Sequence, residues 1–292
     1  MAKQNLTVPM EFILMGVSRR PELQLPLFRV FLIIYTVTVV GNMGMLILTK
    51  VGSTCTHLCI LFYFIRHLTF IDLGNSIVIC PKMLVNFVVE QNTISFYACA
   101  TQMACFIMFI NSELSILSVM AYDHYVAICN SLLYNVIMSQ RLCHVLVGIP
   151  YLYSTLQALL FPIKYFTSTF CGPKVISHFY CDVVPLLPIL CSDAQEIQLL
   201  IILFLAFNLI SSLLVILVSY ILILLAICQM HSAEGRKKAF STCGSHLTGV
   251  VLFYGSLLFM YVQPKSTHSY ETDKLASVFY TLAIPMLNPL MH

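Results

Sequence analysis

Titratable side chains stand at a few places inside otherwise apolar stretches of this sequence. The segment 118–129, SVMAYDHYVAIC, ends a long apolar run with Asp123, His124 and Tyr125. Two titratable groups at such a boundary indicate a functional role. Asp72 and Glu113 lie deeper within apolar runs, and neither acid stays ionised in hydrocarbon without a cation, a proton or water. The chemistry that these acids suggest is the binding of a small cation or a proton.

The composition places these residues in a membrane protein. Of the 292 residues, 59% are hydrophobic and only 9% are charged, and the mean hydropathy is +0.90. A soluble fold of this size needs a polar surface that so few charges cannot supply. We therefore expect a lipid membrane as a partner. The net charge of +3 provides no basic field for nucleic acid.

Seven apolar segments are long enough to cross a bilayer as helices, which takes about 20 mostly apolar residues. Continuous apolar runs such as residues 199–227 alternate too little for the strands of a barrel. The sequence predicts an all-α membrane protein, a seven-transmembrane helix bundle at 26–292 that follows an extracellular segment at 1–25. The predicted helices span residues 26–49, 58–80, 98–121, 141–161, 197–228, 240–262 and 273–291.

The N-terminus is predicted to lie outside the cell. Residues 1–25 lack the basic start, apolar core and cleavage site of a signal peptide, so the first helix would act as an uncleaved anchor. Asn5, in NLT, is an acceptor for N-glycosylation, which requires the lumenal side. The segment GRKK at 235–238 would then be a short basic loop in the cytoplasm.

Four cysteines gather on the same predicted face. Cys171, Cys181 and Cys191 follow the fourth helix at intervals of ten residues, and Cys99 begins the third helix. Four cysteines on one face suit two disulfides in an oxidising compartment. Their positions alone leave the pairing open.

Seven predicted helices and an outside N-terminus occur together with a series of motifs. They are GN (41–42), FIDLGNS (70–76), PKML (81–84), MAYDHYVAICN (120–130), SY (219–220), KAFSTCGSHL (238–247) and PMLNPL (285–290). On these residues the chain resembles a class A, rhodopsin-like G-protein-coupled receptor, and within that class the olfactory (odorant) receptor family. The motifs cover almost the entire chain in the order and at the spacing of the family.

The resemblance implies an odorant receptor, a multi-pass protein of the plasma membrane and of olfactory neuron cilia. It would bind a small volatile odorant and activate a heterotrimeric G protein of the stimulatory type, which raises cyclic AMP. One alternative is a receptor-like chain that is retained inside the cell without signalling. Another is a transporter or channel lined by Asp72, Glu113 and Arg66, although the sequence has no duplicated half. Motifs of an enzyme do not occur.

The resemblance also implies a ligand-binding pocket between the third, fifth, sixth and seventh helices. Because odorants are small and largely apolar, their site should be an enclosed apolar cavity with a few polar groups. The matching residues are Phe106, Ile107, Ile110, Asn111, Phe204, Asn208, Tyr254, Leu257, Leu258, Tyr261, Val278 and Thr281. The apolar members fit ordinary helix packing equally well. Asn111 and Asn208 are more telling, because a buried amide needs a partner that a ligand can provide.

The residues that the resemblance assigns to G-protein switching are Asp123, His124, Tyr125, Tyr220, Asn288 and Pro289. Family members usually carry arginine at position 124, and its planar fork would pair with the acid at rest and reach the docked G-protein helix when active. Histidine is shorter, and an unperturbed imidazole with a pKa of about 6.5 is mostly neutral at pH 7. We therefore predict weak coupling.

The two deep acids become neighbours in the family's arrangement. Asp72 and Glu113 would form a polar site below the ligand, with Asn42 and Asn288 nearby. Such a site would hold a sodium ion, share a proton or serve only as a structural hydrogen-bond network. No other cofactor is expected.

The cysteine pairing also follows from the resemblance, which implies a bond between Cys99 and Cys181 and leaves Cys171 and Cys191 to pair within the loop. The segment HFYCD at 178–182 could be read as a metal site with His178 as a ligand. A disulfide at Cys181 would consume the thiolate that a metal needs, so no metal site is expected.

Several positions depart from the family's pattern. Proline is usual where Ile60 and Ser131 stand, tyrosine is usual at His292, and Arg66 stands where a small polar residue is common. The sequence contains no tryptophan and stops after NPLMH, so we expect no cytoplasmic tail and no eighth helix. The chain reads as a divergent or an eroding member.

Overall fold

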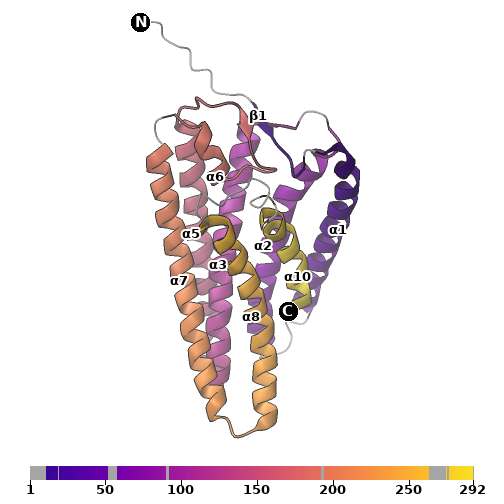
Figure 1. Cartoon of the computed structure of the whole chain (residues 1–292). Coiled ribbons are helices and arrows are strands. Elements are labelled where there is room, and N and C mark those ends of the chain that lie inside the picture. The colour runs from indigo at the N-terminus through magenta and orange to yellow at the C-terminus, as the bar shows by residue number, and fades with distance from the viewer. Residues whose placement is uncertain are drawn as a thin grey trace, which may run out of the picture.

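The protein is a bundle of long helices (Figure 1). The computed structural model describes residues 11–18, 20–51, 58–89, 92–191, 194–262, 274 and 276–291. In this part of the chain, six helices are long and apolar enough to cross a membrane. They are α1 (Pro21–Val51), α2 (Leu58–Val85), α3 (Phe96–Cys129), α5 (Gln140–Thr167), α7 (Ala194–Gln229) and α8 (Ala233–Val262). A π-helical turn, η4 (Phe279–Ala283), continues into the shorter α10 (Ile284–Met291).

Helices suit these apolar runs because a helix satisfies its backbone hydrogen bonds within one segment, as an apolar medium demands. Prolines are tolerated inside such helices, where packing against neighbours compensates for the lost bond. Pro81 lies within α2, and Pro150 and Pro162 lie within α5. The start of α3 is marked by Ser95, whose hydroxyl oxygen accepts a hydrogen bond from the N–H of Ala98 at 3.3 Å.

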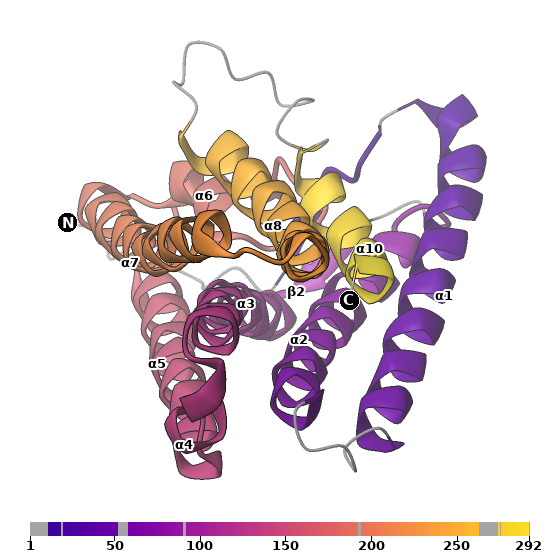
Figure 2. The same ribbon diagram turned by 90° about the horizontal axis from the view of Figure 1, so that it is seen from below.

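The central helix of the bundle is α3, which packs against α2, α5, α7 and α8 (Figure 2). Its middle is buried on all sides, as Met103, Phe106 and Met120 illustrate. A helix that is apolar all round belongs in the interior of a bundle. Polar groups on α3 therefore face other helices, and this places Glu113 and Asn111 inside the protein.

A small sheet closes one end of the bundle, which we call the sheet end. Its strands β1 (Glu11–Leu14), β2 (Thr93–Ser95) and β3 (Val175–Ile176) have the order β2-β1-β3. β1 runs antiparallel to β2, with Phe12 opposite Ile94, and parallel to β3. The ring of Phe12 is fully buried and lies 5.6 Å from the ring centre of Phe170. Residues 11–14 are therefore packed onto the bundle.

Several element boundaries differ from the predicted ones. α8 begins at Ala233 instead of residue 240, so the segment 235–238, expected as a loop, is helical. Ser232 starts this helix, since its hydroxyl oxygen accepts from the N–H of Gly235 at 3.2 Å and its carbonyl accepts from the N–H of Arg236 at 3.1 Å. Hydropathy marks only the apolar part of a helix. A polar end that caps well extends beyond it.

Helix α3 also extends beyond its predicted end at residue 121 and continues to Cys129. Asp123 and His124 therefore lie on a helix. Short elements complete the connections: η2 (Ser131–Leu133), α4 (Tyr134–Ile137), α6 (Val183–Leu186) and η3 (Leu187–Ile189). We call the end of the bundle near α4 the far end, because it lies at the opposite end of α3 from the sheet.

Gly74 allows α2 and α3 to approach closely. A Cβ atom at this position would overlap the ring of Phe109, whereas a Cβ at Gly44 in α1 would meet nothing within 4 Å. We expect Gly74→Ala to destabilise the protein by about 1–3 kcal/mol, a usual cost of overpacking. Gly44→Ala should be neutral or slightly stabilising. Thermal unfolding of the two purified variants tests this, and equal midpoints would show that the helices adjust without cost.

Candidate functional site

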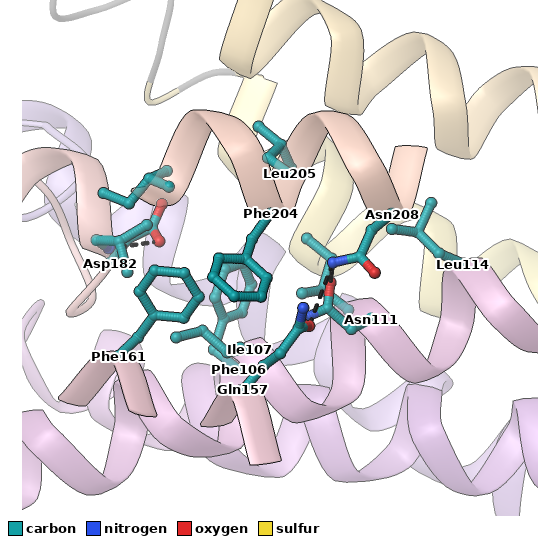
Figure 3. Close-up of a pocket in the computed structure, with 13 residues that line it drawn as sticks. Phe106, Ile107, Asn111, Leu114, Gln157, Phe161, Asp182, Phe204, Leu205 and Asn208 are labelled. Atoms are coloured by element: carbon teal, nitrogen blue, oxygen red, sulfur yellow. Dashed lines mark hydrogen bonds between the residues drawn. The ribbon is translucent and has the colours of Figure 1, made fainter. Parts of the chain in front are cut away.

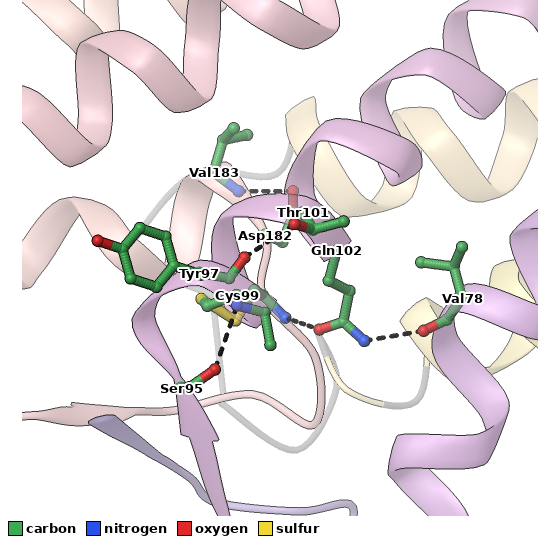
Figure 4. Close-up of a disulfide and its surroundings, with 10 residues drawn as sticks. Val78, Ser95, Tyr97, Cys99, Thr101, Gln102, Asp182 and Val183 are labelled. Carbon is green, nitrogen blue, oxygen red and sulfur yellow. Dashed lines mark hydrogen bonds between the residues drawn. A yellow bond between two sulfur atoms is a disulfide. The ribbon is translucent and has the colours of Figure 1, made fainter. Parts of the chain in front are cut away.

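Two disulfides hold the loop between α5 and α7 at the sheet end. Cys99, at the start of α3, is bonded to Cys181, and Cys171 is bonded to Cys191. The Cα–Cα separations of 5.5 and 5.3 Å are ordinary for disulfides. The pairs are those that the resemblance implied. The first bond ties the loop directly to α3 (Figure 4).

Gln102 strengthens this attachment. Its Oε1 accepts from the N–H of Cys181 at 2.9 Å, and its Nε2 donates to the carbonyl of Val78 at 3.0 Å (Figure 4). Asp182, which follows Cys181 in the sequence, accepts a hydrogen bond from the N–H of Val183 at 2.7 Å and is the N-cap of α6. One buried glutamine thus connects the loop, α3 and α2, and it fixes the position of the residues that follow Cys181.

A cavity lies beneath this loop, between α3, α5 and α7 (Figure 3). Its empty volume of about 510 Å³ includes the space at its open mouth. Its apolar lining consists of Phe106, Ile107, Ile110, Leu114, Phe161, Val183, Ile201, Phe204 and Leu205. The polar members are Asn111, Gln157, Asp182 and Asn208. Such a lining suits a small, mostly apolar molecule that is oriented by a few polar contacts.

Three amide side chains meet at the wall of the cavity, one each from α3, α5 and α7. The Nδ2 of Asn111 donates to Oε1 of Gln157 at 2.6 Å, and the Nδ2 of Asn208 donates to the same oxygen at 3.2 Å (Figure 3). Asn208 Nδ2 also lies 3.4 Å from Oδ1 of Asn111. We call these residues the amide triad. The partner expected for the two asparagines is therefore supplied by the protein.

Only part of the expected pocket lines this cavity. The residues that do are Phe106, Ile107, Ile110, Asn111, Phe204 and Asn208. Tyr254 and Leu257 lie instead in the apolar core, and Val278 packs against that core. The hydroxyl of Thr281 bonds to a carbonyl of its own helix at 2.7 Å. Leu258 is 39% exposed at the protein surface, and the side chain of Tyr261 lies outside the described part.

The cavity reaches toward α5 and the loop, and four lining residues there, Gln157, Phe161, Asp182 and Val183, were missed by the sequence reasoning. Gln157 carried a usable signal, because it is polar and stands in the middle of the predicted helix 141–161. Phe161, Asp182 and Val183 carried none. Their contribution depends on how the disulfide-bonded loop folds over the bundle, and no local pattern specifies that.

The two deep acids are buried near each other in the middle of the bundle. Asp72 on α2 is 0% exposed and Glu113 on α3 is 2% exposed, and the two carboxyl groups are close enough to interact electrostatically. Asn288 on α10 donates from Nδ2 to Oδ2 of Asp72 at 2.9 Å. Within the described part, Asp72 Oδ1 and Glu113 Oε1 have no hydrogen-bond partner. Two such oxygens suit a small cation or a shared proton.

Neighbouring polar groups extend this deep site. The Nδ2 of Asn42 on α1 donates to the carbonyls of Thr38 and Pro285, each at 2.9 Å. Tyr280, in the π-helical turn, places its hydroxyl beside Glu113. The asparagine ties α1 to the last helix. The site therefore draws on five elements of the bundle: α1, α2, α3, η4 and α10.

At the far end, Asp123 and His124 contact different partners. Asp123 Oδ1 accepts from the hydroxyl of Tyr134 at 2.7 Å. The ring of His124 lies 5.1 Å from the ring centre of His246 on α8, at an interplanar angle of 82°. The Tyr220 hydroxyl on α7 hydrogen-bonds with Nδ1 of His246 at 2.7 Å. This cluster joins α3, α7 and α8, and the sequence reasoning assigned no role to Tyr134 or His246.

Three other residues singled out from the sequence have ordinary packing partners. The ring centre of Tyr125 lies 6.2 Å from that of Tyr122. Pro289 packs close to Gly41, where an added Cβ would lie 3.7 Å from the proline ring. The guanidinium of Arg66 lies 5.4 Å from the ring centre of Tyr63. A cation–π contact of this kind offsets part of the cost of a charge in an apolar segment.

The metal-site interpretation of residues 178–182 does not fit the observed contacts. Cys181 is disulfide-bonded, and Nε2 of His178 is hydrogen-bonded with the Ser277 hydroxyl at 3.0 Å. Burial, and secondarily the charge of Lys274, lowers the pKa of His178 to about 3, so the imidazole is neutral. The described residues contain no cluster of three or more His, Cys, Asp or Glu that could hold a metal. The predicted glycosylation site Asn5 and the terminal His292 lie outside the residues that the structure describes.

Comparison with known proteins gives consistent similarities. The family profile for olfactory receptors matches residues 31–292. Human olfactory receptor 8K5 is 74% identical to the chain over 293 residues, which cover 100% of this chain and 94% of the relative. Mouse olfactory receptor 8U3 is 53% identical, with 100% and 91% covered. Squid rhodopsin superposes with a TM-score of 0.71 over 94% of this chain and 78% of its own, at 16% identity. This last similarity confirms the predicted seven-helix fold.

Proposed function

Because this chain belongs to the olfactory receptor family of G-protein-coupled receptors, we propose that it binds a small volatile odorant and raises cyclic AMP through a stimulatory G protein. Members of this family are signalling receptors and not enzymes. The observation that carries the proposal is the mostly apolar cavity with the amide triad in its wall. A volatile molecule is small and mostly apolar, which is what this lining accommodates.

The proposed orientation places the sheet end outside the cell. Both disulfides lie at that end, and disulfides persist in an oxidising compartment. The basic residues of GRKK would then lie at the cytoplasmic end of α8. Glycosylation at Asn5 fits the same orientation. We propose the plasma membrane, and olfactory cilia in particular, as the location.

The proposed signalling step uses the far end of the bundle. An amphipathic helix of the G protein would dock there among α3, α7 and α8, near Asp123, Tyr125 and Tyr220. An agonist shifts the receptor toward the open form only if it binds that form more tightly. Since α3 and α7 line the cavity and also carry the far-end cluster, a change in their packing at the ligand is transmitted along rigid helices.

Asp72 and Glu113 are the residues that we propose to hold a sodium ion in the resting receptor, with Asn288 orienting Asp72. Their two unpartnered buried oxygens support this, because a cation between them would offset the repulsion of two carboxylates. If instead the acids share a proton, the same residues act without a metal. Either arrangement would differ between resting and active packings and would bias the equilibrium between them.

Sodium dependence of stability tests the deep site. We expect sodium chloride to raise the unfolding midpoint of the purified receptor by roughly 2–4 °C relative to choline chloride at equal ionic strength, as ligand linkage predicts for about 1 kcal/mol of binding. Asp72→Asn should remove this difference. Glu113→Gln should reduce it and should change basal signalling. Identical midpoints in the two salts would assign the site to a shared proton or to hydrogen bonding alone.

A cyclic AMP reporter screen with an odorant panel tests the proposed function. Cells that express the chain, with surface labelling of the same cells, should respond to at least one odorant in a dose-dependent way. Labelled receptor that responds to none would contradict the signalling proposal. Chain that stays inside the cell would favour the alternative of a receptor-like protein that does not signal. Substrate flux without cyclic AMP would indicate a transporter.

A further inference from the structure

The amide triad has a surplus of hydrogen-bond donors. The single oxygen Oε1 of Gln157 accepts from both Asn111 and Asn208. The Nε2 of Gln157, with two N–H groups, has no hydrogen-bond partner within the described part of the chain. The residue is 1% exposed, so bulk water does not compensate. A buried amide nitrogen without a partner carries a penalty that a bound acceptor would remove.

The two asparagines of the triad determine which way the side-chain amide of Gln157 is oriented. Both asparagine nitrogens point at the glutamine oxygen. If the Gln157 side-chain amide alone were rotated by half a turn, its Nε2 would face the Nδ2 atoms of Asn111 and Asn208. Both hydrogen bonds to Oε1 would then be lost. With the asparagines as they stand, the oxygen of Gln157 faces the triad, and its nitrogen remains for another partner.

The remaining lining narrows the chemical class of that partner. Within the described part of the chain, the residues that line the cavity include no lysine, arginine or histidine, so a carboxylate would be buried there without a counter-charge. Asp182, the single acid among the described lining residues, already accepts a hydrogen bond from the Val183 N–H at 2.7 Å. Aromatic and aliphatic side chains such as Phe106 and Phe204 make up the rest. A neutral, mostly apolar molecule with one acceptor fits this environment.

We infer that the ligand is a neutral odorant with a carbonyl acceptor, a ketone, aldehyde or ester, and that Gln157 on α5 donates the hydrogen bond that selects it. This assignment rests on the proposed function of the cavity and adds the substrate class and the specificity-determining residue. A hydrocarbon of the same shape would fill the cavity but would leave the Gln157 amide without a partner. The carbonyl oxygen therefore sets the preference between two molecules of equal size.

Paired ligands separate the contribution of the acceptor from that of shape. We would measure the rise in unfolding midpoint of the purified receptor with ketones, aldehydes and esters and with hydrocarbons of matching skeleton, for example carvone with limonene. Each wild-type titration gives a half-saturating concentration, since a ligand that binds only the folded state stabilises it. Carbonyl compounds should saturate at concentrations about tenfold lower than their hydrocarbon partners, as expected for one hydrogen bond.

Gln157→Leu should weaken carbonyl binding by about tenfold and leave hydrocarbon binding within about threefold. Gln157→Met, which is unbranched like glutamine, provides the same test if the leucine variant folds poorly. Leu205→Val is the matched control, because it changes the cavity shape without removing a polar group, and it should affect both members of a pair equally.

The assignment is overturned if hydrocarbons bind wild type as tightly as their carbonyl partners, if only amines or acids bind, or if no compound stabilises the protein. Unchanged carbonyl binding in both Gln157 variants overturns it as well. Cyclic AMP measured with the same compounds distinguishes a failure of the proposed ligand class from a failure of the proposed signalling function. Stabilisation by carbonyl compounds without a cyclic AMP response supports the ligand class and contradicts the signalling proposal.

Discussion

Replacement of Cys181 by serine is expected to abolish delivery of the receptor to the cell surface. The bond to Cys99 spans 82 residues of sequence, and loss of a native disulfide costs roughly 2–5 kcal/mol, more for long loops than for short ones. That is a large part of the roughly 5–15 kcal/mol by which folded proteins are usually stable. The bond also positions the N–H of Cys181 for Gln102 at 2.9 Å. Surface labelling against total expression measures the loss.

Surface labelling of other cysteine variants also tests the role of this disulfide. Cys99→Ser should match Cys181→Ser, and the double variant should be no worse than either single one, because both singles remove the same bond. Cys171→Ser opens a bond that spans only 20 residues and should cost less. Cys228→Ser, at an exposed free thiol, is the control. Normal surface levels of Cys181→Ser would show that the loop holds its place through packing alone.

Hydropathy predicted the helices of the bundle well because lipid imposes a simple rule: a spanning segment must be apolar and about 20 residues long. The rule fails where a helix continues into water, as α8 does toward Ala233. It also says nothing about strand pairing. β1 pairs with residues 93–95 and 175–176, which are far from it in sequence, so its partners are set by tertiary packing.

The candidate site was predictable where a residue's type conflicts with its surroundings. Asp72 and Glu113 are acids in apolar runs, and both are buried near each other. Gln157 is detectable by the same reasoning, because it is a polar residue in the middle of a predicted helix. Apolar lining residues such as Ile201 look like any other residue of a packed helix, so only the three-dimensional arrangement assigns them. The partners of Asp123 and His124 likewise required the structure.

His124→Arg is expected to increase agonist-evoked cyclic AMP. Asp123 accepts the Tyr134 hydroxyl at 2.7 Å, and the His124 ring packs 5.1 Å from that of His246. An arginine at position 124 would add a charge that cannot be lost near pH 7, and its fork extends farther than an imidazole. It could pair with Asp123 at rest and reach toward a docked G-protein helix. Because charge-assisted hydrogen bonds contribute about 1.5–3 kcal/mol, we expect agonist potency to rise by about tenfold or more.

Two further substitutions separate charge and geometry from size. Glutamine is neutral and similar in size to histidine, so His124→Gln should leave signalling unchanged or make it weaker. His124→Lys carries the charge without the planar fork, and its gain should be smaller than that of arginine. All variants must be compared at matched surface levels, since a new charge beside His246 can also lower the folded yield. An arginine variant that is displayed equally well and signals no better across a broad odorant panel would show that coupling in this receptor does not depend on the side chain at position 124. In that case neither an arginine at position 124 nor the contact of His124 with His246 would be required for coupling to the G protein.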